Sequence, residues 1–182
     1  MVYYYKPIKW VTGWFILSSI ICLWDATYIL FRPYSFPGGK LHFIWAPYAK
    51  YYEIDYVYGQ LAYEDRDGFP AGQSTINLVE ITLNMVYVLS MALSTTPSTR
   101  LNGAFAGLIG ATSCFFKTVL YLLAEWYSDC KYVGHNSWFN LIFLYLVPSS
   151  PWVIVSFLSM LAIAKQLKAA ILAPADKVKK DN

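Results

Sequence analysis

The stretch Ser74–Ser94, STINLVEITLNMVYVLSMALS, decides the fold because it contains a single charged residue, Glu80, in an otherwise uncharged run. A run of this length and composition predicts a membrane-spanning helix. A carboxyl group is costly in hydrocarbon unless it faces protein, water or a ligand. Asn77 and Asn84 lie three residues before and four residues after Glu80, so a helix places them on one face. Tyr87 continues that face, which we predict points toward other helices.

The composition of the whole chain predicts a membrane protein. Of its 182 residues, 57% are hydrophobic and 14% are charged, and the mean hydropathy is +0.40. Soluble domains of this size are less apolar. The net charge of +3 comes from basic residues near the chain ends, which favours contact with membrane lipids over nucleic acid. Soluble-enzyme motifs and metal-site spacings are absent from the sequence, so we expect no cofactor and no metal.

Four apolar runs predict an all-α, polytopic membrane protein in which residues 1–182 form a single domain, a four-helix bundle. The predicted helices span roughly Val11–Phe31, Ser74–Ser94, Leu101–Trp126 and Trp138–Lys165. A long loop rich in tyrosine, proline and glycine, residues 32–73, joins the first two helices. Its aromatic composition predicts that it lies on the membrane surface or caps the bundle. Pro148 and Pro151 predict a kink in the last helix.

Two further charged residues interrupt the apolar runs. Asp25 lies about six residues from the end of the first helix, so it either faces the bundle or reaches the lipid headgroups. Lys117 lies too far from both ends of its helix to reach the headgroups easily, and Tyr121 shares its face. Lys117 either forms a structural ion pair, with Glu80, Asp25 or Glu125, or sets the ionisation state of an active carboxyl group.

The basic residues predict the topology and the location of the protein. Lysine and arginine are more numerous on the side of the two chain ends, which places both termini in the cytosol. The basic tail, residues 169–182, ends in KKDN and resembles the dilysine retrieval signal of endoplasmic-reticulum membrane proteins. The alternative is a basic tail attracted to anionic lipid. We therefore expect a multi-pass protein of the endoplasmic-reticulum membrane.

Several segments, taken in order, resemble the EXPERA-domain membrane proteins, which include the emopamil-binding-protein sterol isomerases and the sigma-2 receptor. The segments are ICLWDATYILF (21–31), WAPYAKYYEIDYVYG (45–59), VEITLN (79–84), TVLYLLAEWYSD (118–129) and GHNSWFNLIFLYLVPSSPWVIV (134–155). The resemblance covers about residues 11–168. It implies that Glu80 and Asp25 correspond to the acids of the isomerases, and that Trp152 corresponds to the tryptophan of their last helix.

The resemblance implies an isomerase, or a cyclase-like relative, that acts on a sterol or terpenoid in the endoplasmic-reticulum membrane. Its catalytic residues would be Glu80 and Asp25, which exchange protons with the substrate while aromatic side chains stabilise a carbocation. The expected substrate-binding residues are Trp24, Asn77, Asn84, Tyr87, Lys117, Tyr121 and Trp152.

An alternative is a non-catalytic protein that binds sterol or lipid and keeps only the pocket. Ile21 stands where the isomerases have a histidine, and Ser149 lies near the position of their asparagine. Both differences favour this alternative. The oligomeric state stays open, with a homodimer among the alternatives.

Overall fold

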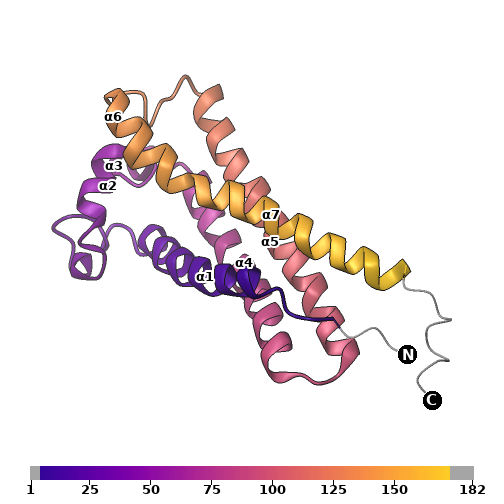
Figure 1. Ribbon diagram of the computed structural model, residues 1–182. Helices are drawn as coiled ribbons and strands as arrows, with labels where there is room; N and C mark the ends of the chain where they lie inside the picture. Colours follow the sequence, from indigo (N-terminus) through magenta and orange to yellow (C-terminus); the bar gives the residue numbers. More distant parts are fainter. Residues whose placement is uncertain (1–4, 173–182) are drawn as a thin grey trace, which may run out of the picture.

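The computed structural model describes residues 5–172, and this part of the chain contains helices and no strand. Four helical stretches are long and apolar enough to cross a membrane: Lys9–Leu30, Phe69–Leu93, Pro97–Tyr127 and Trp138–Leu172. The first three are α1, α4 and α5. The fourth consists of α6 (Trp138–Asn140), a π-helical segment (Leu141–Leu146) and α7 (Val147–Leu172) (Figure 1). The prediction of an all-α chain with four such helices is confirmed.

The helices α4 and α5 begin earlier than their apolar runs predict. α4 begins at Phe69 rather than at Ser74, and α5 begins at Pro97 rather than at Leu101. Each has a proline in its first turn, where the missing N–H would have no helical partner in any case. The added turn of α5, residues 97–100, is mainly polar, whereas that of α4, residues 69–73, is mainly apolar or small.

The helix α7 extends to Leu172, so the first residues of the predicted tail are helical. Lys168, which lies just before these residues, is exposed. The rest of the tail, including Lys179 and Lys180, lies outside the described residues, as do residues 1–4.

A serine hydroxyl compensates for the proline inside the last long helix. Pro151 lies inside α7 and has no N–H for the Val147 carbonyl, four residues earlier. The Ser150 hydroxyl donates to that carbonyl at 2.8 Å. The Ser149 hydroxyl donates to the Tyr145 carbonyl at 2.7 Å. The backbone acceptors near Pro151 therefore keep hydrogen-bond donors, as a helix that crosses a membrane requires.

The helix α4 lies between α1 and α5, and α5 also packs along α7 (Figure 1). The contact between α4 and α5 depends on glycine, because small residues let two helices approach closely. A Cβ atom added to Gly107 would lie 2.6 Å from Tyr87 Cδ2, and one added to Gly110 would lie 2.6 Å from Asn84 Oδ1. By contrast, α1 and α7 contact each other little.

Replacing Gly107 by alanine is expected to destabilise the protein by about 1–3 kcal/mol, because the added methyl group overlaps the Tyr87 ring. The matched control is Gly72→Ala in α4, where an added Cβ has no neighbour within 4 Å. That change should be neutral or stabilising by up to ~1 kcal/mol, since alanine favours helix. Thermal unfolding in detergent measures both. Equal shifts for the two variants would contradict the close approach of α4 and α5.

Residues 31–68, which we call the α2–α3 segment, contain a 3₁₀ turn (His42–Trp45), α2 (Tyr48–Ile54) and α3 (Gln60–Glu64). The sequence predicted a loop here, whereas the structure folds part of it into short helices. Hydrogen bonds attach the segment to the connection between α5 and α6: Tyr56 N donates to the Tyr132 carbonyl at 3.1 Å.

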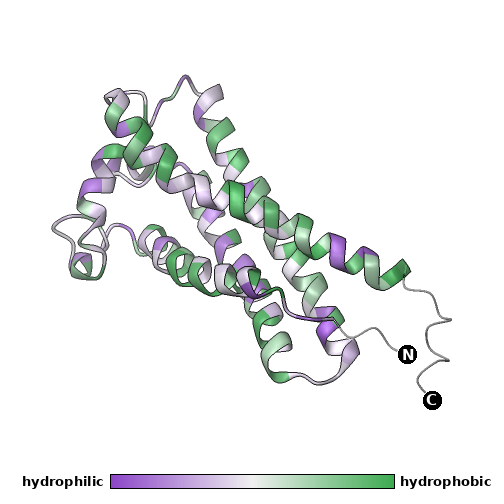
Figure 2. Cartoon of the chain, viewed as in Figure 1, coloured by the Kyte–Doolittle hydropathy of each residue, from purple (hydrophilic) through white to green (hydrophobic). Residues whose placement is uncertain are grey.

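Hydrophobic residues cover most of α7, and hydrophilic residues gather near α2 and α3 (Figure 2).

Candidate functional site

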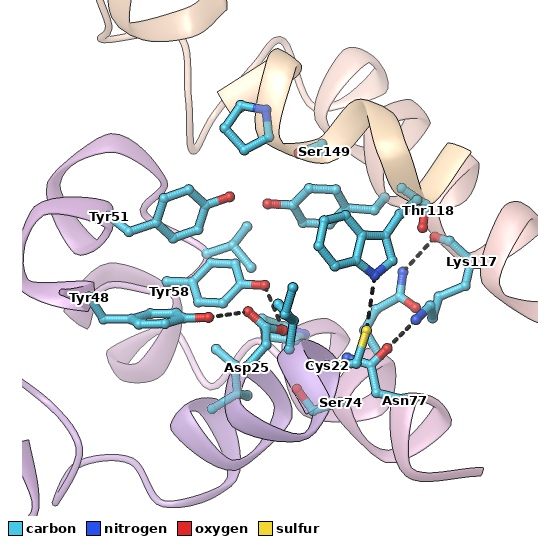
Figure 3. A pocket seen from close by; sticks show the side chains of 18 of the residues that line it. Cys22, Asp25, Tyr48, Tyr51, Tyr58, Ser74, Asn77, Lys117, Thr118 and Ser149 are labelled. Carbon is cyan, nitrogen blue, oxygen red and sulfur yellow. Dashed lines mark hydrogen bonds between the residues drawn. The ribbon is translucent and has the colours of Figure 1, made fainter. Parts of the chain in front are cut away.

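A cavity of about 360 Å³ lies among α1, α4, α5, α7 and the α2–α3 segment (Figure 3). This volume falls within the range of small-molecule binding sites. Its wall is mainly apolar and aromatic, and among the described residues it contains two charged side chains, Asp25 from α1 and Lys117 from α5. The cavity therefore combines an apolar interior with one acidic and one basic group.

Two tyrosines of the α2–α3 segment hold Asp25. The Tyr48 hydroxyl donates to Asp25 Oδ1 at 2.5 Å, and the Tyr58 hydroxyl donates to Oδ2 at 3.1 Å. Burial, and then the neighbouring Asp25, raise the pKa of both tyrosines, so both keep their protons and act as donors. Hydrogen bonds to both oxygens fix the orientation of the Asp25 carboxyl group.

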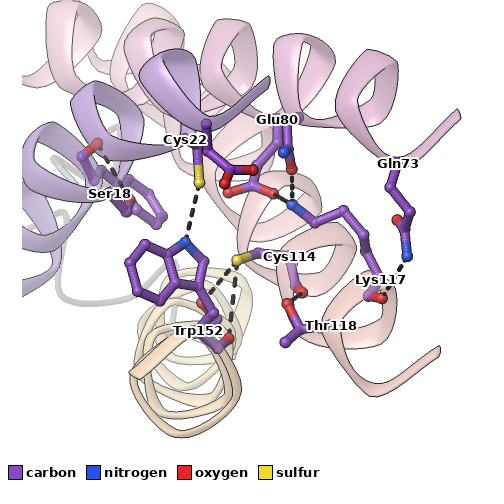
Figure 4. Close-up of polar contacts among 12 residues, drawn as sticks. Ser18, Cys22, Gln73, Glu80, Cys114, Lys117, Thr118 and Trp152 are labelled. Carbon is purple, nitrogen blue, oxygen red and sulfur yellow. Dashed lines mark hydrogen bonds and ion pairs between the residues drawn. The ribbon is translucent and has the colours of Figure 1, made fainter. Parts of the chain in front are cut away.

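Lys117 pairs with Glu80, which is one of the three partners that the sequence left open. Lys117 Nζ lies 2.7 Å from Glu80 Oε2 (Figure 4), and the two side chains are 10% and 1% exposed. The ammonium group also donates to the side-chain oxygen of Asn77 (Figure 3). Glu80 does not line the cavity, so Lys117 lies between this carboxylate and the open volume. The ion pair joins α4 to α5 in a place with little access for water.

Trp152 of α7 also lines the cavity. Its indole Nε1 donates to Cys22 Sγ at 3.0 Å, and its ring meets Trp14 edge to face with centroids 5.6 Å apart. Both contacts come from α1, so the indole bridges the two helices that otherwise touch little. Its orientation is therefore set by α1 as well as by its own helix.

Comparisons with protein-family models, with curated proteins and with solved structures give no match.

The structure brings five of the residues predicted for the site to the cavity wall. They are Asp25, Asn77, Lys117, Tyr121 and Trp152. The sequence left two locations open for the Asp25 side chain, the interior of the bundle or the lipid headgroups, and the structure places it in the interior. The side chains that reach the wall come from four helices, α1, α4, α5 and α7, so the predicted residues converge on one volume.

Four other predicted residues lie outside the wall. Glu80 lies beyond Lys117, and Asn84 packs against Gly110 of α5. Tyr87 is fully buried, and its ring packs edge to face on Phe15 at 5.1 Å. Trp24 donates its indole N–H to the Ile44 carbonyl at 3.0 Å. Tyr87 and Trp24 thus make packing contacts and hydrogen bonds away from the open volume.

Sequence reasoning missed Tyr48 and Tyr58 as individual site residues. They lie far from Asp25 along the chain, and the sequence does not show the path of the segment between them. The high density of tyrosine in residues 45–59 was the one feature of the sequence that pointed to them. Tyrosine side chains suit a site that is both apolar and hydrogen-bonding, because each has an aromatic ring and a hydroxyl group.

A further acid, Asp55, lies directly after α2, outside the cavity wall. It is fully buried, accepts a hydrogen bond from Val57 N at 3.0 Å, and accepts another from the Tyr121 hydroxyl. Burial raises the pKa of Asp55 from 3.8 to about 7, although these two hydrogen bonds lower it. Asp55 therefore holds Tyr121, a cavity residue, in place through a carboxyl group that titrates near neutrality.

The stability of the folded protein is expected to fall as the pH rises from about 4 to about 8, in part because Asp55 must lose a proton that the folded state holds more tightly than the unfolded chain does. The stabilisation by the neutral form is fully present below the unfolded pKa and is lost as the pH passes through the folded pKa. The variant Asp55→Asn should lose this part of the dependence. Thermal unfolding at several pH values measures it, with Asp65→Asn as the exposed control. An unchanged pH slope in Asp55→Asn would refute the role of Asp55.

Proposed function

We propose that this protein is a membrane-embedded isomerase that shifts a double bond in a sterol or terpenoid. One observation carries the proposal: a partly buried carboxyl group, Asp25, faces an apolar, aromatic cavity among helices that are apolar enough to lie in a membrane. Such a cavity suits a hydrocarbon ligand, and a carboxyl group is the simplest group that both gives and takes a proton. The resemblance to EXPERA-domain isomerases points to the same chemistry.

The reaction needs one proton in and one proton out. In its neutral form, Asp25 gives its proton to one alkene carbon, which leaves a carbocation on the neighbouring carbon. The resulting carboxylate removes a proton from a different adjacent carbon, and the electrons of that C–H bond form the new double bond. Asp25 thereby returns to its starting form, and no co-reactant is consumed. The faces of the tyrosines and of Trp152 stabilise the cation.

In this proposal Asp25 contacts the substrate, and Glu80 acts through Lys117. The positive charge of Lys117 lies on the same wall as Asp25 and stabilises its carboxylate after the first proton transfer. Glu80 neutralises Lys117, so the empty cavity carries no uncompensated positive charge. Asn77 fixes the ammonium group between them.

A non-catalytic protein that binds sterol or lipid is the second candidate. A specific observation favours it: Ile21 lines the cavity at the position where the resemblance places the histidine of the isomerases. An aliphatic side chain there removes one proton-transfer group from the wall. The oxygens of Asp25 and the charge of Lys117 are also already paired within the protein.

We place the protein in the endoplasmic-reticulum membrane, with both termini cytosolic and the four long helices forming a bundle that the aromatic α2–α3 segment caps. Basic side chains support this orientation, since Lys6 and Lys9 precede or begin α1 while Lys165 and Lys168 lie near the end of α7. Membrane lipids would then surround the exposed apolar faces of the helices.

Isotope exchange tests the proposed function. Purified protein in lipid nanodiscs is incubated in deuterated water with individual sterols and polyprenoids, and the recovered lipids are analysed by mass spectrometry. An isomerase incorporates deuterium into the product, because the proton that Asp25 delivers has exchanged with solvent. Saturable binding of the same lipids without any incorporation would favour the non-catalytic candidate instead.

A further inference from the structure

Lys117 is chemically different from the other lysines of the described chain. Between residues 5 and 172, every other lysine is exposed, whereas Lys117 lies in the wall of the cavity with its side chain 10% exposed. A primary amine in an apolar pocket can attack a carbonyl carbon, and lysines in such pockets form Schiff bases with aldehydes and ketones. The chain thus presents one amine to apolar ligands in a place that solvent does not reach freely.

Glu80 gives this amine a partner for proton transfer. Its Oε2 lies 2.7 Å from Lys117 Nζ, on the side away from the open volume, and Glu80 itself is 1% exposed. A proton that moves from the ammonium group to Glu80 leaves a neutral, nucleophilic amine and a neutral acid. Two opposite charges disappear together, so the step leaves no unpaired charge in the hydrocarbon region.

The walls near Lys117 favour an apolar ligand that carries one carbonyl group. Tyr121 lies one helical turn along α5, and Trp152 faces the same volume from α7. These rings offer extended contact to a conjugated or branched hydrocarbon chain. The oxygen of Asn77 already accepts a hydrogen bond from the nitrogen of Lys117, and it would hold the N–H of an iminium ion in the same way.

From this geometry we propose that Lys117 captures an apolar aldehyde as a Schiff base, with Glu80 as proton carrier and counter-ion. The neutral amine adds to the carbonyl carbon, and the C=O bond becomes C–OH in a carbinolamine. Glu80 then returns its proton to the leaving hydroxyl group, and water departs as the C=N bond forms. The product is an iminium ion beside the Glu80 carboxylate, with the same net charge as the ion pair that it replaces. The proposal makes no use of Asp25 and does not rest on the isomerase function.

The test uses the wild-type protein in nanodiscs and retinal, a terpenoid aldehyde, as the probe. After incubation, borohydride reduces any imine to a stable amine, and peptide mass spectrometry locates it. We expect modification of Lys117 to exceed that of Lys131 by about tenfold or more, which corresponds to about 1.4 kcal/mol. Lys131 is the matched comparison, because it also pairs with a carboxylate, Asp65, at 2.8 Å, but is 47% exposed and lies outside the cavity. Retinal absorption should shift to longer wavelength as the protonated imine forms.

Variants identify the groups that cause the effect. Lys117→Arg keeps a positive charge opposite Glu80 but offers no amine, so both the adduct and the absorption shift should disappear, whereas Lys131→Arg should keep both. Glu80→Gln should weaken the absorption shift, since the iminium ion loses its counter-ion. Modification spread over the exposed lysines of the wild-type protein, with Lys117 unmodified, would overturn the proposal. That result is obtained without any variant, so it stands even if a substitution prevents folding.

Discussion

Replacement of Asp25 by asparagine is expected to lower the rate of the double-bond shift by about 10²–10⁴-fold, the usual contribution of a positioned acid or base. The amide has the shape of the carboxyl group but neither gives nor takes a proton at a useful rate. Ligand binding should change by less than about tenfold, because the apolar wall that provides most of the contact is unaltered. Deuterium incorporation measures the rate, and displacement of a bound sterol measures the affinity.

The matched control is Asp65→Asn, which removes an acid that pairs with Lys131 and lies outside the cavity. Its rate should equal that of the wild-type protein. Asparagine at position 25 also changes the hydrogen bonds, because its nitrogen cannot accept from the Tyr58 hydroxyl as Oδ2 does. Thermal unfolding therefore accompanies the kinetics, so that a folding defect is not taken for a chemical one. A folded Asp25→Asn variant with wild-type activity would remove Asp25 from the reaction.

The inward face of α4 was predictable from the sequence because it depends only on helical periodicity. The buried residues of α4 include Asn77, Glu80, Asn84, Tyr87 and Met91, which recur at intervals of three and four. The cost of a carboxyl group in lipid gave this face its direction. The prediction that the face points into the protein is therefore confirmed along the whole helix.

Which of these residues reaches the cavity was not predictable in the same way. Lys117 extends from α5 and covers Glu80, whereas Asn77, one turn earlier, stays on the wall. This outcome depends on how α4 and α5 are placed against each other, which the glycines of α5 determine through close approach. The residue pattern within one helix does not reveal which side chain of the neighbouring helix lies against it.

The surroundings of Asp25 were hidden for a related reason. Its partners, Tyr48 and Tyr58, belong to a segment in which proline and glycine predict turns, and the periodicity that identifies long helices is missing there. Their position depends on contacts with the α5–α6 connection, such as the stacking of Tyr56 on His135 at 3.8 Å. Non-local contacts of this kind place short helices, and a single sequence does not reveal them.

Replacing Lys117 by methionine is expected to reduce the free energy of unfolding by about 3–5 kcal/mol, because it leaves the Glu80 carboxylate buried without its partner. Methionine has a similar length and keeps most of the apolar packing, so the loss reflects the missing charge rather than a missing volume. Chemical or thermal unfolding in detergent measures the effect. An unchanged or higher stability would mean that Glu80 is already neutral or that other groups compensate its charge.

A double-mutant cycle identifies the partner of Lys117. Glu80→Gln alone leaves a buried ammonium group without a counter-ion, whereas Lys117→Met combined with Glu80→Gln removes both charges and should regain much of the lost stability. The matched comparison is the exposed pair Lys131–Asp65, whose coupling should be about 0–1 kcal/mol. Additive effects of the two substitutions at Lys117 and Glu80 would show that the groups are not coupled. A coupling clearly above that of the exposed pair would instead show that Glu80 holds Lys117 in its position beside the cavity. The proposed capture of an aldehyde by Lys117 depends on that position.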